Sequence, residues 1–193
     1  MFNSLSALPK SCYKILEYLA SDPNAEELWK MLKYADYDAL KQPSLTIQEK
    51  LDMIWKKGPQ SKYNIFMGKL IEDAMAESKC ILKIYDYYIH ASSLYSGVVV
   101  YAFDFLYGGQ MELVDYNGVP VSRGDLFVHK ILQCLNGVEI GGIGKLMFFD
   151  DQSRYDLAKT TIGDSKKFTG IQLFMSTEMG DTGRKDRCDS YGY

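Results

Sequence analysis

The chain has 193 residues, a formal net charge of -3 at pH 7 and a sequence pI near 5.4. This length suits one domain with a proper core, and the 47% hydrophobic and 24% charged residues are typical of a globular protein, which excludes global disorder. Basic and acidic residues are interspersed and no apolar run reaches the roughly 18 to 20 residues of a membrane span, so we expect neither sequence-specific nucleic-acid binding nor a membrane partner.

Residues 1–60 are predicted to form an N-terminal helical region that packs on the main domain. Apolar residues recur at helical spacing, first over Ser11–Ala20 and then beyond Asp22, which can cap a helix that has proline at its first position. Thr46 and Glu49 have the spacing of a capping box. We therefore expect at least three helices before the first strand.

Residues 61–179 are predicted to form an α+β domain, because the hydrophobic period changes to two. Cys80–Ile89 and Val98–Tyr107 are expected strands, rich in β-branched and aromatic residues. The second strand is apolar on both faces, with Asp104 as the charged exception. We expect a helix to cover one face, and a partner or a neighbouring element to cover the other.

The second half of this domain predicts a hairpin, a helix and two closing strands. Asp115–Gly118 is a turn signal, and Ser122 begins an amphipathic helix. Strands are expected over Ile143–Phe149 and Phe168–Met175, with the polar loop Asp150–Lys167 between them. The predicted fold is a mostly antiparallel sheet of four or five strands packed against one amphipathic helix. Residues 180–193 lack apolar periodicity and are expected to be a flexible C-terminal tail.

The glycine-rich run Gly141–Lys145 invites comparison with a phosphate-binding loop. Such a loop needs a glycine five positions before the Gly-Lys pair and a hydroxyl residue after the lysine, but Glu139 and Leu146 stand there. The run also follows a helix and precedes a strand, which is the reverse of the required order. We therefore interpret it as a helix exit and a turn.

No spacing in the sequence predicts a catalytic, cofactor or metal site. His90 and His129 are the only histidines, and the acidic pairs are adjacent residues that point apart on a helix or into solvent in a loop. The four cysteines form no CxxC pair, which disfavours a local zinc site; they are Cys12, Cys80, Cys134 and Cys188. We expect a protein without catalysis and without a cofactor. The alternative is a small cytosolic enzyme or ligand-binding α+β domain with a pocket between the sheet and the N-terminal helices.

The order of elements resembles that of tail-terminator and related neck proteins of tailed bacteriophages. The resemblance spans Glu26 to Met179. It is carried by short segments: Leu28–Tyr34, Asp38–Leu40, Pro43–Thr46, Leu135–Gly137, Gly142–Leu146 and Phe168–Leu173. The helical N-terminal sixty residues and the extra tail depart from the small terminator pattern, so terminator, stopper and connector rings all remain open.

The resemblance implies a structural virion protein of the phage neck, assembled in the host cytoplasm. It implies a homo-oligomeric ring, commonly of six subunits, that joins or terminates the tail tube at the head-tail interface, beside other neck, tail-tube or connector proteins and near packaged DNA. We expect the protein contacts to come from one face of the second strand and from the basic part of the tail: Tyr101, Phe103, Phe105, Tyr107, Arg184, Lys185 and Arg187. A phage-carried inhibitor of a host protein is a weaker alternative.

Overall fold

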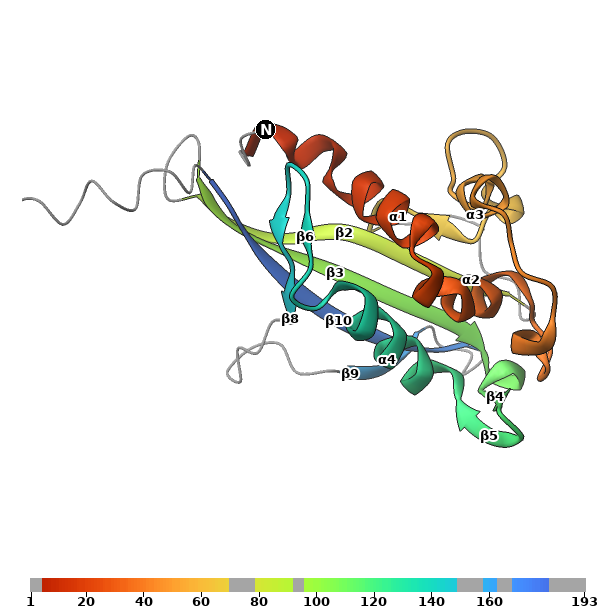
Figure 1. The fold of residues 1–193 in the computed structure, drawn as a ribbon. Helices are drawn as coiled ribbons and strands as arrows, with labels where there is room; N and C mark the ends of the chain where they lie inside the picture. The colour runs from red at the N-terminus through yellow and green to blue at the C-terminus, as the bar shows by residue number, and fades with distance from the viewer. Residues whose placement is uncertain (1–4, 70–78, 92–95, 149–157, 163–167, 181–193) are drawn as a thin grey trace, which may run out of the picture.

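The protein is a layer of helices on one face of a twisted sheet (Figure 1). This arrangement confirms the predicted α+β class. The tail beyond Gly180, including Arg184, Lys185 and Arg187, lies outside the described residues. The computed structural model describes residues 5–69, 79–91, 96–148, 158–162 and 168–180.

Six strands of the described chain form the main sheet, in the order β1-β2-β3-β10-β8, with β9 also paired to β10. The pair of β1 and β2 is parallel, and the other pairs are antiparallel. The strands are β1 (Ile65–Phe66), β2 (Cys80–Ala91), β3 (Gly97–Gly108), β8 (Met147–Phe148), β9 (Ala158–Ile162) and β10 (Phe168–Met179).

The strand β9 corrects the sequence prediction, which placed these residues in a loop. Ala158–Ile162 pairs with the first half of β10, in the register Phe168 opposite Ile162. Its sequence, Ala-Lys-Thr-Thr-Ile, favours a strand, but its polar neighbours hide that preference. The closing strand β10 is also longer than predicted and ends at Met179.

Local capping signals in the N-terminal region are confirmed. The Asp22 carboxylate accepts a hydrogen bond from the amide of Asn24 at 2.9 Å, and Thr46 and Glu49 form a complete capping box. The α-helices are α1 (Ser11–Ser21), α2 (Glu26–Lys33), α3 (Ile47–Asp52) and α4 (Arg123–Leu135). Short 3-10 helices are η1 (Leu5–Lys10), η2 (Pro23–Ala25), η3 (Ala39–Lys41), η4 (Gln60–Lys62) and η5 (Gly109–Met111).

Two small hairpins flank α4. The first joins β4 (Leu113–Tyr116) to β5 (Val119–Ser122) through a turn in which Asn117 and Gly118 both have positive φ. The second joins β6 (Glu139–Ile140) to β7 (Gly144–Lys145). The glycine-rich run is thus the turn of a hairpin after the helix exit, and it does not open a helix.

Helices α1, α2 and α4 pack on one face of the sheet and share one hydrophobic core with it. The rings of Phe127 on α4 and Phe105 on β3 stack with their centroids 4.3 Å apart. Gly124 permits this approach, because a Cβ there would lie 2.8 Å from the Tyr107 hydroxyl and 2.7 Å from the Cδ1 atom of Ile171. The N-terminal helices and the sheet therefore exclude water from the same interior.

The Arg123 side chain is fully buried at the start of α4. Among the described contacts, its guanidinium donates no hydrogen bond to a carboxylate. It donates to backbone carbonyls and, at 3.8 Å, to the Cys80 sulfur. The backbone acceptors are five carbonyl oxygens at 2.9 to 3.1 Å, those of Met31, Tyr34, Ala35, Asp36 and Met111. One side chain therefore joins the end of α2, the following loop and η5.

Replacing Arg123 is expected to destabilise the fold strongly. In Arg123→Met, the free energy of unfolding should fall by about 3 to 5 kcal/mol, because buried carbonyls that lose a donor cost roughly 1 to 3 kcal/mol each before relaxation. Urea unfolding followed by circular dichroism measures the loss. Lys145→Met at an exposed site is the control, and a loss below about 1 kcal/mol in Arg123→Met would contradict this role.

Candidate protein-interaction surfaces

The four aromatic residues predicted to contact a partner lie in the core of the chain itself. Tyr101, Phe103, Phe105 and Tyr107 are at most 2% exposed and belong to the cluster that β3 shares with the helices. The prediction that they form a protein interface is corrected accordingly, because the helical layer occupies their face. Arg184, Lys185 and Arg187 lie outside the described residues.

On the opposite face of β3, side chains pack beside those of neighbouring strands in the same sheet. Val100 and Ala102 pack with Tyr85 of β2 and Phe174 of β10. Near the β1 end, Leu106 packs with two further buried residues, Phe66 and Ile81. The helical layer confirms the expectation that a helix covers one face of this strand, and a partner or element covering the other face stays a prediction.

Asp104, the charged exception on this face, has a complete set of polar partners. The Lys83 ammonium lies 2.8 Å from its carboxylate, Gln172 donates to it at 2.6 Å, and the Tyr85 hydroxyl donates at 3.2 Å. Burial, followed by the charge of Asp104, raises the pKa of Tyr85. The phenol therefore stays protonated, and the cluster links three strands as a structural element.

The far half of β2 is the most exposed apolar part of the sheet. Tyr87, Tyr88 and Ile89 are 41%, 47% and 37% exposed. Within the described residues β1 pairs with β2 only at Leu82 and Lys83, so it does not extend along this half of the edge. Exposed apolar strand edges are common sites of protein association.

The alternation of apolar and polar residues along β2 could not predict this exposed surface. The register between β2 and β3 shifts between Asp86 and Tyr88, which interrupts the alternation of the two faces. The run Tyr87-Tyr88-Ile89 after Asp86 is a possible signal, because consecutive apolar residues cannot all point to one face of a regular strand.

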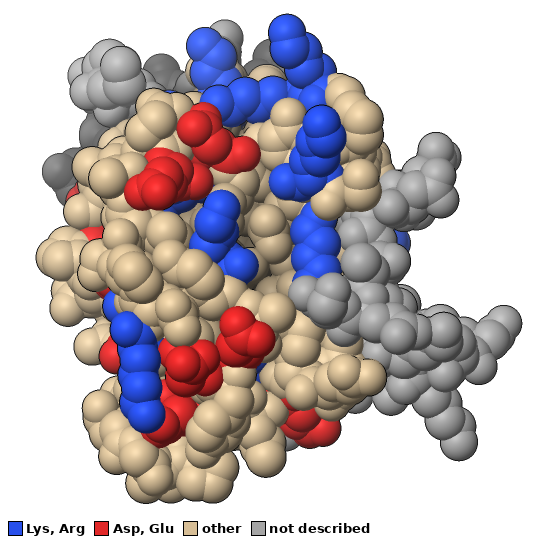
Figure 2. Space-filling view, turned by 90° about the vertical axis from the view of Figure 1, so that its right-hand side faces the viewer, with Lys and Arg blue, Asp and Glu red and all other residues tan. Residues whose placement is uncertain are grey.

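Charge is distributed unevenly over the end of the molecule seen in Figure 2. Several basic side chains lie near the upper margin, and further basic and acidic side chains are interspersed below them (Figure 2).

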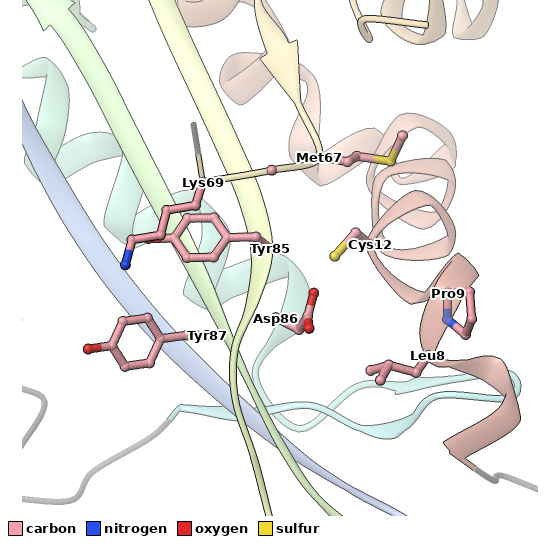
Figure 3. Close-up of a pocket in the computed structure, with 9 residues that line it drawn as sticks. Leu8, Pro9, Cys12, Met67, Lys69, Tyr85, Asp86 and Tyr87 are labelled. Carbon is pink, nitrogen blue, oxygen red and sulfur yellow. The ribbon is translucent and has the colours of Figure 1, made fainter. Parts of the chain in front are cut away.

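A groove of about 580 Å³ lies beside the open edge of β2 (Figure 3). One wall comes from η1 and α1, and the other from β2 and the segment after β1. Its lining residues are Leu8, Pro9, Cys12, Met67, Gly68, Lys69, Tyr85, Asp86 and Tyr87.

The Cys12 thiol in this groove does not have the properties of an activated nucleophile. Burial, and then the negative charge of Asp86, raise the pKa of the Cys12 thiol to about 11, and hydrogen bonds offset this only in part. Cys12 is consequently a neutral thiol at pH 7, whereas a catalytic cysteine needs a lowered pKa.

The described residues contain no group of three or more His, Cys, Asp or Glu side chains that could hold a metal ion. Both histidines are exposed, His90 at the far end of β2 and His129 on α4. None of the helices in the described ranges is long and apolar enough to cross a membrane.

Comparison with protein families gives a match over most of the chain. The model of a family described as YomW matches residues 25–177, which run from the start of α2 almost to the end of β10. This family is phage-derived and is associated with a Bacillus prophage. Neither the curated proteins nor the solved structures contain a significant match.

Slow alkylation of Cys12 is the expected behaviour of its neutral thiol. Two pKa units above the ordinary value leave roughly a hundredfold less thiolate at pH 8, so iodoacetamide should modify Cys12 about a hundredfold more slowly than free cysteine. Timed alkylation, digestion and mass spectrometry of the Cys12 peptide measure this rate, with the urea-unfolded protein as the control. Modification as fast as that of free cysteine would instead favour a reactive site in the groove.

Proposed function

The chain belongs to the YomW family, a phage-derived family, and we propose that it is a structural protein of the neck of a tailed phage. In this proposal, copies of the chain form a ring at the head-tail interface that joins or terminates the tail tube. The ring contacts other neck, tail-tube or connector proteins and lies near packaged DNA, in the virion.

The family match is the observation that carries this proposal. It spans residues 25–177 and so includes the central strands, α4 and both small hairpins. The phage association therefore concerns the folded body of the protein and not a short motif. The resemblance to neck proteins, which rests on segments within the same range, supplies the specific role.

Two features of the described residues support a structural role without catalysis. The polar cluster around Asp104 has its hydrogen-bonding groups occupied by one another. The thiol of Cys12 has a raised pKa, which makes it a poor nucleophile. Exposed apolar residues on β2 also supply contact area of the kind found at protein interfaces.

The alternative function is a ligand-binding domain or small enzyme, and the groove beside β2 is the observation that favours it. Its volume of about 580 Å³ is within the range of small-molecule sites, and Lys69 and Asp86 offer opposite charges. A thermal-shift screen with nucleotides, divalent cations and small organic acids addresses it. Stabilisation by several degrees would favour this alternative, provided that it disappears in Asp86→Ala.

Ring formation is the expected outcome for the purified protein or for the protein on virions. Native mass spectrometry over a range of concentrations should detect a closed oligomer, and negative-stain microscopy should show rings. Gold-labelled antibody against the chain should bind purified particles at the junction of head and tail. Labelling absent from virions, together with a monomer at every concentration, would contradict the proposed neck role.

A further inference from the structure

One margin of the molecule carries a basic turn. From Met53 to Lys69 the sequence has no acidic residue but contains four lysines, of which Lys56, Lys57 and Lys62 surround the Gly58-Pro59 turn. These three lysines are exposed. We call residues 55–62 the basic turn.

The basic turn is held in shape by hydrogen bonds within the same region. The Trp55 amide donates to the carbonyl of Ile65 at 2.8 Å, and its indole donates to the carbonyl of Gly58 at 3.0 Å. Gly58 has a φ of 82°, which favours glycine. The Lys79 ammonium donates to the Ser61 carbonyl at 2.8 Å. The lysines are therefore presented on an ordered backbone.

A hollow with one acidic residue, Glu112, in its lining lies between the η3 region and η5. Its volume is about 500 Å³, and its lining residues are Tyr37, Gly109, Gln110, Glu112 and Leu113. Tyr37 and Leu113 are 49% and 50% exposed. Asp36 and Asp38, on either side of Tyr37, are also exposed. We call this site, with Asp36 and Asp38, the acidic hollow.

The backbone of the acidic hollow is fixed from behind. The Arg123 guanidinium donates to the carbonyls of Ala35 and Asp36 at 3.1 and 2.9 Å, and the Asp115 amide donates to the carbonyl of Tyr37 at 2.8 Å. Lys41, a nearby base, forms an ion pair with Asp115. The segment consequently presents its side chains outward from a fixed main chain.

We propose that the basic turn of one copy docks into the acidic hollow of a second copy of this chain. The lysine ammonium groups would lie beside Asp36, Asp38 and Glu112, where opposite charges attract. The aromatic face of Tyr37 offers a further site for a cation. The apolar parts of Trp55 and Leu113 supply contact area that water would otherwise cover.

A second copy is the occupant that the charges favour, because each copy carries both complementary sites. A contact between two different sites of identical subunits is of the head-to-tail type, and it closes into a ring when the rotation between subunits permits. This inference rests on the proposed function, since it specifies how copies of a neck ring meet.

Charge reversal tests the contact. The basic-turn variant is Lys56→Glu, Lys57→Glu and Lys62→Glu, and the hollow variant is Asp36→Lys, Asp38→Lys and Glu112→Lys. Each variant alone brings like charges together, so its self-association should weaken by roughly a hundredfold or more. An equimolar mixture brings opposite charges together at both sites and should assemble again. Sedimentation velocity at low salt measures all three samples.

Lys10→Glu, Lys69→Glu and Lys145→Glu together form a matched control, because these exposed lysines lie outside both sites and give the same change of charge. This control should assemble like the unmodified chain. Circular dichroism and thermal melting verify the fold of each variant. If a reversed variant does not fold, the neutral set Lys56→Gln, Lys57→Gln and Lys62→Gln replaces it, with a smaller expected loss.

The outcomes separate this contact from the proposed function. If rings form and both reversed variants also form them, the docking proposal is overturned while the neck role stands. Failure of the mixture to assemble, when each folded variant alone is monomeric, likewise overturns the docking proposal. If the unmodified chain never self-associates, alone or on virions, both the docking proposal and the proposed ring fail.

Discussion

The buried guanidinium of Arg123 is the constraint on which the arrangement of the helical layer depends. A charge without a carboxylate partner is costly in a protein interior unless polar groups surround it. Here the carbonyl oxygens at and after the end of α2 surround it. The carbonyls of Met31 and Tyr34 carry the partial negative charge of the C-terminus of α2, so they suit a cation. Arginine suits this set of carbonyls better than lysine, because its planar guanidinium group can donate several hydrogen bonds at once.

The other end of α2 is fixed by two ion pairs. Its first two residues, Glu26 and Glu27, bind the ammonium groups of Lys50 on α3 and Lys130 on α4 at 2.7 and 2.6 Å. Both lysines are buried, so removing either carboxylate would leave a cation with less compensation in the interior. The glutamates also lie at the positive end of the helix dipole. Helix α2 is therefore bound through charge at both ends, which explains how a helix of eight residues joins α3 and α4 to the sheet.

Local signals predicted the fold well, and contacts distant in sequence were not predictable. The capping box at Thr46, the cap at Asp22 and the strands β2 and β3 all follow from short-range patterns. The alternation along β3 correctly grouped Tyr101, Phe103, Phe105 and Tyr107 on one face, but both faces of that strand are apolar. Periodicity alone therefore could not show which face the helices of the chain cover.

The candidate surfaces were harder to predict, because they combine segments that are far apart in the sequence. A basic residue at the start of an amphipathic helix gives no sign that it will be buried, and Arg123 acts on carbonyls about ninety positions away. The register shift in β2 likewise exposes Tyr87 and Tyr88 where regular alternation would bury one of them.

The location of the core determines where contacts with other proteins can form. The helical layer covers one face of the sheet, and strand side chains bury much of the other face of β3. Among the described residues, the far half of β2 and the segment between α2 and η3 carry exposed side chains. In the latter segment the same guanidinium that holds α2 also fixes the main chain that carries Asp36 and Tyr37. A partner that docks on these side chains meets a segment that is already ordered, so little conformational entropy is lost on binding. The guanidinium that stabilises the interior thus also fixes the main chain of an exposed, charged segment.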